Sequence, residues 1–157
     1  MKPRYLLDTH ALIWAVQDTT RLGTKARRVL DSAGDGEVVV SSHSVVELGR
    51  LIQAGTVETD GRPSDWFAPI LRRFPVLPAS LEAAIAAPVL RLPHADPFDR
   101  LIVAEALALR VPLITKDGNI TDSGVVRVVW YVNQTEQKLT KIGLAPVGLA
   151  DPVCLAA

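Results

Sequence analysis

Short apolar runs alternate along the chain with longer segments in which apolar positions recur every three or four residues. Runs of four or five residues rich in Val, Ile and Leu are typical of strands covered on both faces, whereas the longer periodic segments are typical of helices. The pattern predicts strands at residues 4–8, 37–41, 75–78, 111–115 and 127–131. It predicts helices at residues 24–33, 44–54, 63–74, 80–90 and 96–110.

The segment 96–110 carries the clearest helix signal. Asp96 is placed to be the N-cap and Pro97 occupies the first helical position, where a missing N–H costs nothing. In the segment before it, Pro88 is expected to kink or end the helix. Several apolar residues of 96–110 fall on one helical face, namely Leu101, Ala104, Leu107 and Ala108.

The alternation of strands and helices predicts the fold class. Strands that alternate with helices form βαβ units, so we expect a three-layer α/β/α domain around a mostly parallel central sheet. This domain would span residues 1–131. Residues 132–157 lack this periodicity and are interpreted as a C-terminal appendage of unknown role, either disordered or packed on a partner.

Composition narrows the class of protein. The 157 residues are 48% hydrophobic and 22% charged, which excludes intrinsic disorder. The single cysteine, Cys154, forms no internal disulfide and cannot build a zinc site alone, which fits a reducing compartment. We find neither a signal peptide nor an apolar run long enough to span a membrane. A cytoplasmic protein is therefore expected.

Carboxylates follow several of the predicted strands. Asp8 ends the first strand, Asp117 lies two residues past the strand 111–115, and Glu47 lies in the first turn of the helix after strand 37–41. Asp96 and Asp99 occupy the cap and first turn of the helix 96–110. Parallel strands bring such positions to one edge of the sheet, where ligands bind. Carboxylates gathered there need a cation, and an all-oxygen ligand set favours Mg²⁺ or Mn²⁺.

Most of these acids also have a purely structural interpretation. Ser44 and Glu47 have the spacing of a capping box, and Asp99 in a first turn stabilises the helix dipole. Asp117 followed by glycine is typical of a turn. Asp8 has no such explanation, because a carboxylate that ends a core strand adds nothing to the strand.

Other polar and aromatic residues carry weaker signals. His10 and His94 lie near the predicted site as candidate bases or phosphate contacts, and Arg100 is placed either to hold a phosphate or to pair with a neighbouring acid. The chain has no P-loop, no GxGxxG and no GxSxG motif, which argues against the usual nucleotide-binding proteins and serine hydrolases. The three tryptophans are expected in the core or an interface: Trp14, Trp66 and Trp130.

Four motifs together resemble those of the PIN-domain family, and within it the VapC-type toxins of bacterial toxin–antitoxin pairs. The resemblance covers roughly residues 4–131, nearly all of the chain. They are LLDTHALIW from residue 6, the acid of SVVELGRL, LPHADPFDRLIVAEAL from residue 92, and LITKDGNI from residue 113.

The resemblance implies a Mg²⁺-dependent ribonuclease, with Mn²⁺ as a substitute, that cuts single-stranded or loop RNA. The family's acidic quartet corresponds to Asp8, Glu47, Asp99 and Asp117, and Asp96 matches an additional acid of members with a DPFDR motif. Asp8 and Asp99 are the expected direct metal ligands, with Asp96 and Asp117 as further candidates. Glu47 or Asp117 would orient or deprotonate the attacking water.

The same resemblance implies partners and supporting residues. Thr9 and Thr115 stand beside the acids and are candidates to donate hydrogen bonds to a carboxylate or a phosphate. A cognate VapB-type antitoxin is expected to insert a segment with Arg or Lys among the acids in place of metal. A homodimer is the family expectation.

Two alternatives compete with the nuclease. A receiver-like signalling domain has an acidic pocket at strand ends with a Thr and a Lys nearby, as in Thr115 and Lys116, but it needs a phosphoacceptor Asp at the end of a middle strand. The run EVVVSS supplies none. The other alternative is a non-catalytic PIN scaffold that binds RNA or protein.

The net charge of zero, from 17 basic and 17 acidic residues, first argues against a nucleic-acid partner. If the four quartet acids face metal, however, the rest of the chain carries a charge of +4. Basic residues outside the site would then attract the RNA backbone. The candidates are Arg27, Arg28, Arg72, Arg73, Arg91 and Arg100.

Overall fold

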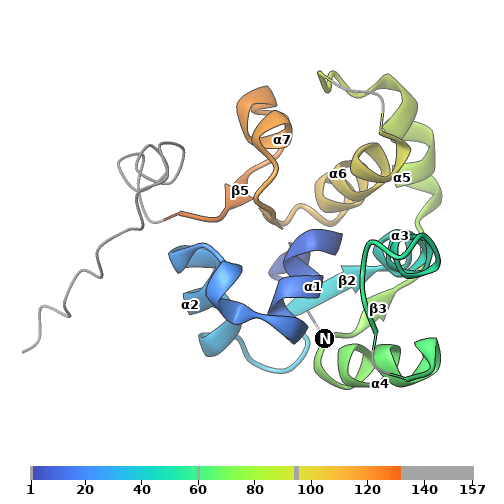
Figure 1. Cartoon of the computed structure of the whole chain (residues 1–157). Coiled ribbons are helices and arrows are strands. Elements are labelled where there is room, and N and C mark those ends of the chain that lie inside the picture. The colour runs from blue at the N-terminus through green and yellow to red at the C-terminus, as the bar shows by residue number, and fades with distance from the viewer. Residues whose placement is uncertain (1, 60, 94–95, 132–157) are drawn as a thin grey trace, which may run out of the picture.

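The computed structural model describes residues 2–59, 61–93 and 96–131. A five-stranded parallel sheet forms its centre, in the order β3-β2-β1-β4-β5 (Figure 1). The strands are β1 (Tyr5–Leu7), β2 (Val38–Ser41), β3 (Val76–Leu77), β4 (Leu113–Ile114) and β5 (Val128–Val129). All five lie within the predicted segments. The appendage expected at 132–157 lies outside the described residues.

Helices cover both faces of the sheet. The α-helices are α1 (Thr9–Gln17), α2 (Thr24–Ser32), α3 (Ser42–Gln53), α4 (Pro63–Arg73), α5 (Leu81–Ala86), α6 (Pro97–Leu109) and α7 (Gly118–Ser123). Two single turns of 3₁₀-helix, η1 (Thr19–Arg21) and η2 (Ala87–Val89), follow α1 and α5. None of the helices in the described ranges is long and apolar enough to cross a membrane.

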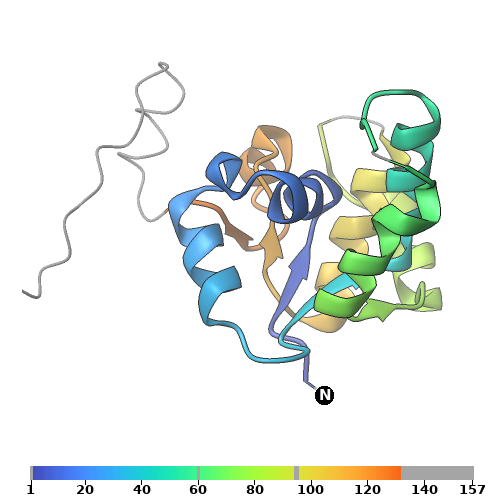
Figure 2. The same cartoon turned by 60° about the horizontal axis from the view of Figure 1, so that its bottom comes forward.

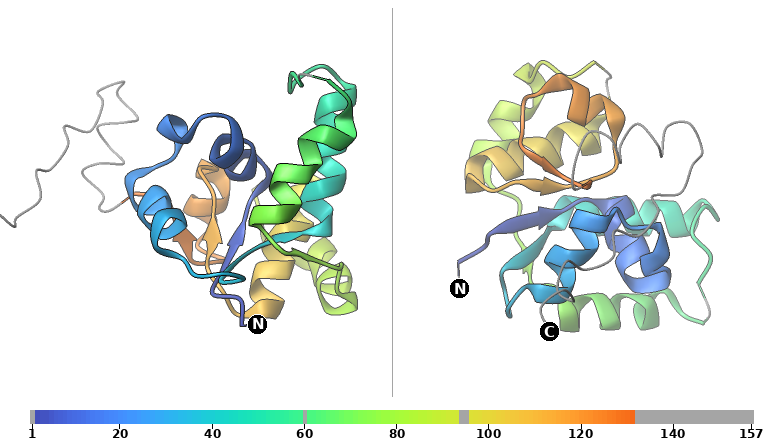
Figure 3. Two further views of the ribbon diagram at one scale, coloured as in Figure 1. Left: turned by 90° about the horizontal axis from the view of Figure 1, so that it is seen from below. Right: turned by 90° about the vertical axis from the view of Figure 1, so that its left-hand side faces the viewer.

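Alternating strand residues divide the core between the two faces, as the pleat requires. Leu7 and Ile114 belong to the cluster that packs against α1, α2 and α4, whereas Leu6 and Leu113 belong to the cluster under α6 and α7. All four side chains are fully buried. The right-hand view of Figure 3 shows the two helical layers on either side of the sheet, which confirms the predicted three-layer α/β/α architecture.

Helix α6 confirms its predicted start but not its predicted buried face. Asp96 caps it, accepting a hydrogen bond from the Phe98 N–H at 2.8 Å, and Pro97 is its first residue. The helix is covered by the sheet on one side and by α5 on another, so it buries Ile102 and Val103 while Leu107 is 38% exposed. A single apolar stripe through Leu107 was therefore the wrong description of this helix.

The segment 80–90 ends as Pro88 predicts. Helix α5 stops at Ala86, and Pro88 lies in the 3₁₀ turn η2 that follows. Two helices were not predicted at all. Helix α1 follows β1 directly, and α7 follows β4 where only a turn was expected.

The strand order places a crevice between β1 and β4. The chain leaves β1 towards β2 on one side and leaves β4 towards β5 on the other, so the connections after these two strands diverge. Figure 2 shows α1 and α7 starting at this carboxyl edge, with the chain's N-terminus at the opposite edge. Such a switch point is where open α/β sheets bind ligands. The order differs from the 2-1-3-4-5 order of flavodoxin-like receivers, which removes the receiver-like alternative.

Candidate active site

Asp8 lies at the switch point as the N-cap of α1. Its extended backbone ends β1, and its Oδ1 accepts a hydrogen bond from the Thr9 N–H at 2.7 Å. Its Oδ2 accepts a second one from the Thr115 hydroxyl at 2.8 Å. The side chain is only 5% exposed. Asp8 is thus a fixed, buried carboxylate whose position is set by two adjacent strands.

Thr115 connects the ends of β1 and β4. Its hydroxyl donates to Asp8 and accepts a hydrogen bond from the Asp117 N–H at 3.0 Å. Asp117 in turn caps α7, its Oδ1 accepting from the Ile120 N–H at 2.8 Å. Asp117 therefore acts as a helix cap and lies one hydroxyl away from Asp8. The expected turn at this residue is instead the start of a helix.

Glu47 lies on α3 and is 6% exposed. The helix begins at Ser42, with Ser41 as its N-cap, so Glu47 lies beyond the first turn. The proposed capping box between Ser44 and Glu47 is therefore absent, and this structural interpretation is wrong. No hydrogen bond in the described part of the chain occupies the buried Ser44 hydroxyl.

The charges of all four other predicted acids act on Asp99. Burial, and to a lesser extent the neighbouring charges of Asp8, Asp96, Asp117 and Glu47, together raise the pKa of Asp99 to about 7. Asp99 comes from the first turn of α6 on one face of the sheet, and Glu47 from α3. Elements far apart in the sequence therefore bring five acids into one electrostatic cluster.

Burial also raises the pKa of Asp8, to about 6. The Thr115 hydrogen bond and the charge of His10 oppose this rise, and the charge of Glu47 adds to it. Two carboxyls of the cluster thus hold protons more tightly than free aspartate. Raised pKa values of this kind are typical of functional sites, because a stable core has no use for repelling carboxylates.

The chemistry of this cluster fits a hard divalent cation. All its donors are carboxylate oxygens, and a cation would relieve the repulsion that raises the pKa of Asp99. Within the described ranges, no three such side chains are close enough together to enclose an ion as they stand.

The remaining predicted residues have varied surroundings. The hydroxyl of Thr9 is fully buried and has no hydrogen-bond partner among the described residues. His10 is exposed, with its ring 6.2 Å from that of Trp14. Arg100 donates through Nη1 to the carbonyl oxygens of Leu90 at 2.8 Å and Ala87 at 3.3 Å, so this nitrogen braces the segment before α6. His94 lies outside the described residues.

Two cations beside the cluster were not identified as RNA contacts from the sequence. Arg21 and Lys116 both lie over the ring of Trp14, with Cζ and Nζ at 4.7 Å and 5.3 Å from its centroid. Lys116 has a sequence signal, because it stands between Thr115 and Asp117. Nothing in the sequence around Arg21 points to the site.

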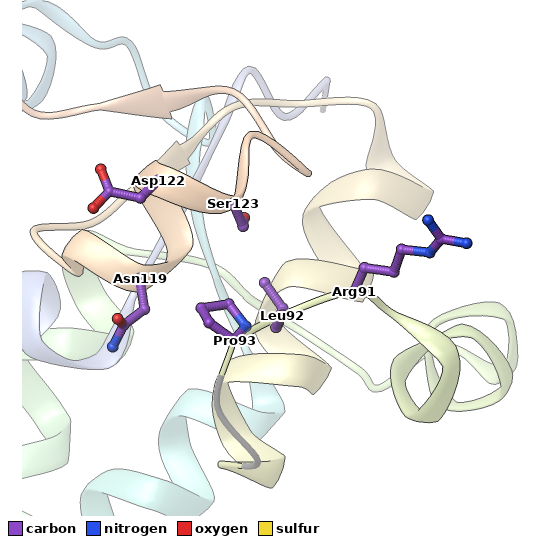
Figure 4. Close-up of a pocket in the computed structure, with 6 residues that line it drawn as sticks. All are labelled: Arg91, Leu92, Pro93, Asn119, Asp122 and Ser123. Carbon is purple, nitrogen blue, oxygen red and sulfur yellow. The ribbon is translucent and has the colours of Figure 1, made fainter.

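A separate pocket of about 510 Å³ opens beside α7 (Figure 4). None of the five acids lines it. It lies between the segment before α6 and the outer side of α7. Its lining residues are Arg91, Leu92, Pro93, Asn119, Asp122 and Ser123.

Comparisons with known proteins agree with the α/β fold described above. Ribonuclease VapC22 of Mycobacterium tuberculosis is 29% identical over 115 residues, which cover 71% of this chain and 85% of that protein. The fold resembles DNA-bound VapBC from Salmonella typhimurium, with a TM-score of 0.64 and 18% identity over 80% of this chain and 96% of that one. It also resembles FitAcB from Neisseria gonorrhoeae, with a TM-score of 0.60 and 20% identity over the same shares. The PIN domain family model matches residues 5–124, and the chain therefore belongs to the PIN domain family.

Proposed function

We propose that this protein is a metal-dependent endoribonuclease that cleaves single-stranded or loop RNA, the toxin of a toxin–antitoxin pair. The observation that supports the proposal is the buried Asp8 carboxylate, joined through the Thr115 hydroxyl to Asp117, together with the charges of Asp8, Glu47, Asp96 and Asp117 that raise the pKa of Asp99. The match to a ribonuclease named VapC22 supports the same activity.

Asp8 and Asp99 would hold a Mg²⁺ or Mn²⁺ ion, with Asp96 and Asp117 completing the set. A bound ion of this kind supplies a water of lowered pKa and stabilises the charge on the leaving oxygen. The protein contributes the position of the carboxylates. Asp8 cannot rotate freely because both of its oxygens accept hydrogen bonds.

Glu47 is the better candidate to accept a proton from the attacking water. Asp117 already accepts a hydrogen bond from the Ile120 N–H as a helix cap, which restrains its carboxylate. Glu47 is buried on a different element and caps no helix. A carboxylate shielded from bulk water whose charge acts on both Asp8 and Asp99 is suited to accept the water's proton.

We further propose a cognate antitoxin and a homodimer. The structural relatives include VapBC and FitAcB. An antitoxin segment with Arg or Lys among the acids would neutralise them in place of metal.

For the homodimer, α5 and η2 present exposed apolar residues four positions apart: Leu81, Ile85 and Val89 are 76%, 68% and 79% exposed. The RNA substrate and antitoxin would be met in the cytoplasm.

Cleavage of a labelled single-stranded RNA by the purified protein tests the activity. We expect cleavage with Mg²⁺ or Mn²⁺ and none in EDTA. In cells, expression of the protein is expected to arrest growth, and Asp8→Asn to relieve the arrest while the folded protein accumulates. Metal binding without cleavage of any RNA tested would instead favour the non-catalytic PIN scaffold.

A further inference from the structure

We propose that Arg21 and Lys116, both placed over the indole of Trp14, form a site for a backbone phosphate of the RNA strand beside the carboxylate cluster. This inference rests on the proposed ribonuclease function and adds to it the side chains that hold the strand. The carboxylate cluster explains how a phosphodiester would be cut. It does not explain how a negatively charged RNA strand stays bound beside five acids.

Trp14 provides a rigid base for the two cations. It is only 9% exposed and belongs to the core cluster on the α1 face of the sheet. Its ring lies 5.8 Å from that of Trp130, so a second buried indole supports it. A ring fixed in this way holds a cationic side chain by cation–π attraction and limits the rotamers available to it.

Arg21 reaches the ring from η1. This turn is braced by Asp18, whose carboxylate accepts hydrogen bonds from the Thr20 N–H and the Thr20 hydroxyl. Those two bonds do most to lower the pKa of Asp18, and the charges of Arg21 and Arg27 contribute less. An arginine stacked on an aromatic face keeps its edge N–H groups available, and these match phosphate oxygens.

Lys116 reaches the same ring from the end of β4. Its neighbours on both sides belong to the cluster, since the Thr115 hydroxyl bonds to Asp8 and to the Asp117 N–H. The Lys116 backbone is therefore fixed by the same contacts that fix the acids. Segments 95 positions apart in the sequence, η1 and the end of β4, therefore bring their cations to the same indole.

The patch adjoins the acids. Trp14 lies on the helix that Asp8 begins, roughly 9 Å further along its axis at the usual rise per residue. His10, one turn before Trp14, lies close enough to Asp8 for its charge to lower the pKa of that carboxyl. One RNA strand could thus contact the cluster and the patch together.

Several arginines expected to attract RNA have other partners. Arg27 donates to the Thr19 carbonyl oxygen at 2.8 Å, Arg73 to that of Ala15 at 3.2 Å, and Arg100 to that of Leu90. Arg21 and Lys116 are exposed, and Lys116 stands between Thr115 and Asp117 at the carboxyl edge of the sheet. Their position favours a phosphate of the substrate over a distant, non-specific contact.

Binding of a labelled single-stranded RNA in EDTA, followed by fluorescence anisotropy across a salt series, tests the proposal without cleavage. The variant is Arg21→Gln/Lys116→Gln. The matched control is Arg127→Gln/Lys2→Gln, which removes the same two residue types from exposed positions just before β5 and β1, at the opposite edge of the sheet. Circular dichroism and Tm establish that both are folded.

We expect the Arg21/Lys116 variant to bind RNA about tenfold more weakly, and the slope of log affinity against log salt to fall by about 0.7, the value for one phosphate contact on a single strand. The control should retain the wild-type slope. With metal, the variant should raise KM and leave kcat within about twofold.

Equal losses in the two double variants, or no measurable RNA binding by the wild-type protein at low salt, would overturn the proposal. So would competition by poly-glutamate as potent as competition by RNA, because the patch would then accept any polyanion, such as an acidic protein segment. The binding measurement distinguishes failure of the phosphate site from failure of the proposed function. A protein that binds RNA through Arg21 and Lys116 but never cleaves it would refute the nuclease and retain the phosphate site.

Discussion

A single hydroxyl, that of Thr115, organises the carboxyl edge of this protein. It is fully buried, donates to Asp8 and accepts from the Asp117 N–H. Because Asp8 follows β1 and Asp117 follows β4, this hydroxyl joins the two strands at the point where their connections diverge. The acids could be identified from the sequence, but this bond could not, because it depends on the pairing of strands more than a hundred residues apart.

Thr115→Val keeps the shape of the residue and removes the hydroxyl. The buried Asp8 carboxylate and the partly buried Asp117 N–H lose their partner, so we expect the free energy of unfolding to fall by about 1–3 kcal/mol. The lost hydrogen bond also raises the pKa of Asp8, which moves the acid limb of the kcat/KM profile to higher pH. Thr115→Ser should restore the wild-type profile. An unchanged profile in Thr115→Val would mean that the hydroxyl only supports packing.

Asp99 should make the metal-free protein less stable as pH rises. Its folded pKa of about 7 exceeds the ordinary aspartate value of 3.8, so the folded state binds the proton more tightly than the unfolded state. Stability therefore falls as pH rises from about 4 to 7, and the loss is complete above that window. In EDTA, Asp99→Asn should raise Tm at pH 8 and leave it unchanged at pH 4.

The matched control for this experiment is Asp31→Asn, at an exposed position on α2. It should leave Tm unchanged at both pH values. A Tm of Asp99→Asn that does not exceed that of the wild type at pH 8 would show that burial and neighbouring charges do not destabilise the ionised Asp99 carboxylate.

At the scale of elements, most helices and strands could be predicted because their apolar periodicity is strong. Helix α1 was missed because it buries residues around most of its circumference and shows no clear polar face. Helix α7 was missed because GNITDS is short and starts with a dipeptide typical of turns. For α3, Ser41 rather than Ser44 provides the cap, so the sequence assigned Glu47 to the wrong turn.

The N-terminus of α2 depends on a close approach at Gly23. The Trp130 carbonyl oxygen accepts hydrogen bonds from the Lys25 and Ala26 N–H groups at 3.1 Å and 3.3 Å. A Cβ on Gly23 would collide with that oxygen and with the Trp130 ring. We expect Gly23→Ala to lower the free energy of unfolding by about 2 kcal/mol, measured by urea denaturation.

Gly49→Ala is the control for this substitution. Gly49 lies inside α3, and a Cβ there meets no atom within 4 Å. Alanine should therefore stabilise the protein by about 0.5–1 kcal/mol through reduced backbone entropy. Equal effects of the two substitutions would contradict the role assigned to the contact between Gly23 and Trp130.

At the scale of the whole molecule, the α/β class and the gathering of acids at one edge could be predicted, because parallel strands place their carboxyl ends together. The order β3-β2-β1-β4-β5 could not be derived from hydrophobic pattern, since any order of parallel strands buries the same runs. The net charge of zero shows how composition differs from spatial arrangement. Sequence could count the charges, but only the fold places Lys116 and Arg21 beside the acids.

The proposed homodimer predicts a change of mass on substitution of the apolar face of α5. Ile85→Glu places a charge at a residue that is 68% exposed in the single chain. We expect the wild type to sediment as a dimer and Ile85→Glu as a monomer. Leu71→Glu, at another exposed apolar residue on α4, should remain dimeric. A monomeric wild type, or dissociation by Leu71→Glu alone, would contradict this placement of the interface.

The central claim is that the acids around Asp99 form one metal-dependent centre that cuts RNA. Its most direct test is the initial rate of cleavage of one single-stranded RNA across a Mg²⁺ titration, in the wild type, Asp8→Asn, Asp99→Asn and the control Asp31→Asn. We predict loss of at least about a hundredfold in rate for both site variants, on the scale of removing electrostatic stabilisation from an active site, and wild-type rates for the control. Full activity in Asp8→Asn and Asp99→Asn would contradict the account.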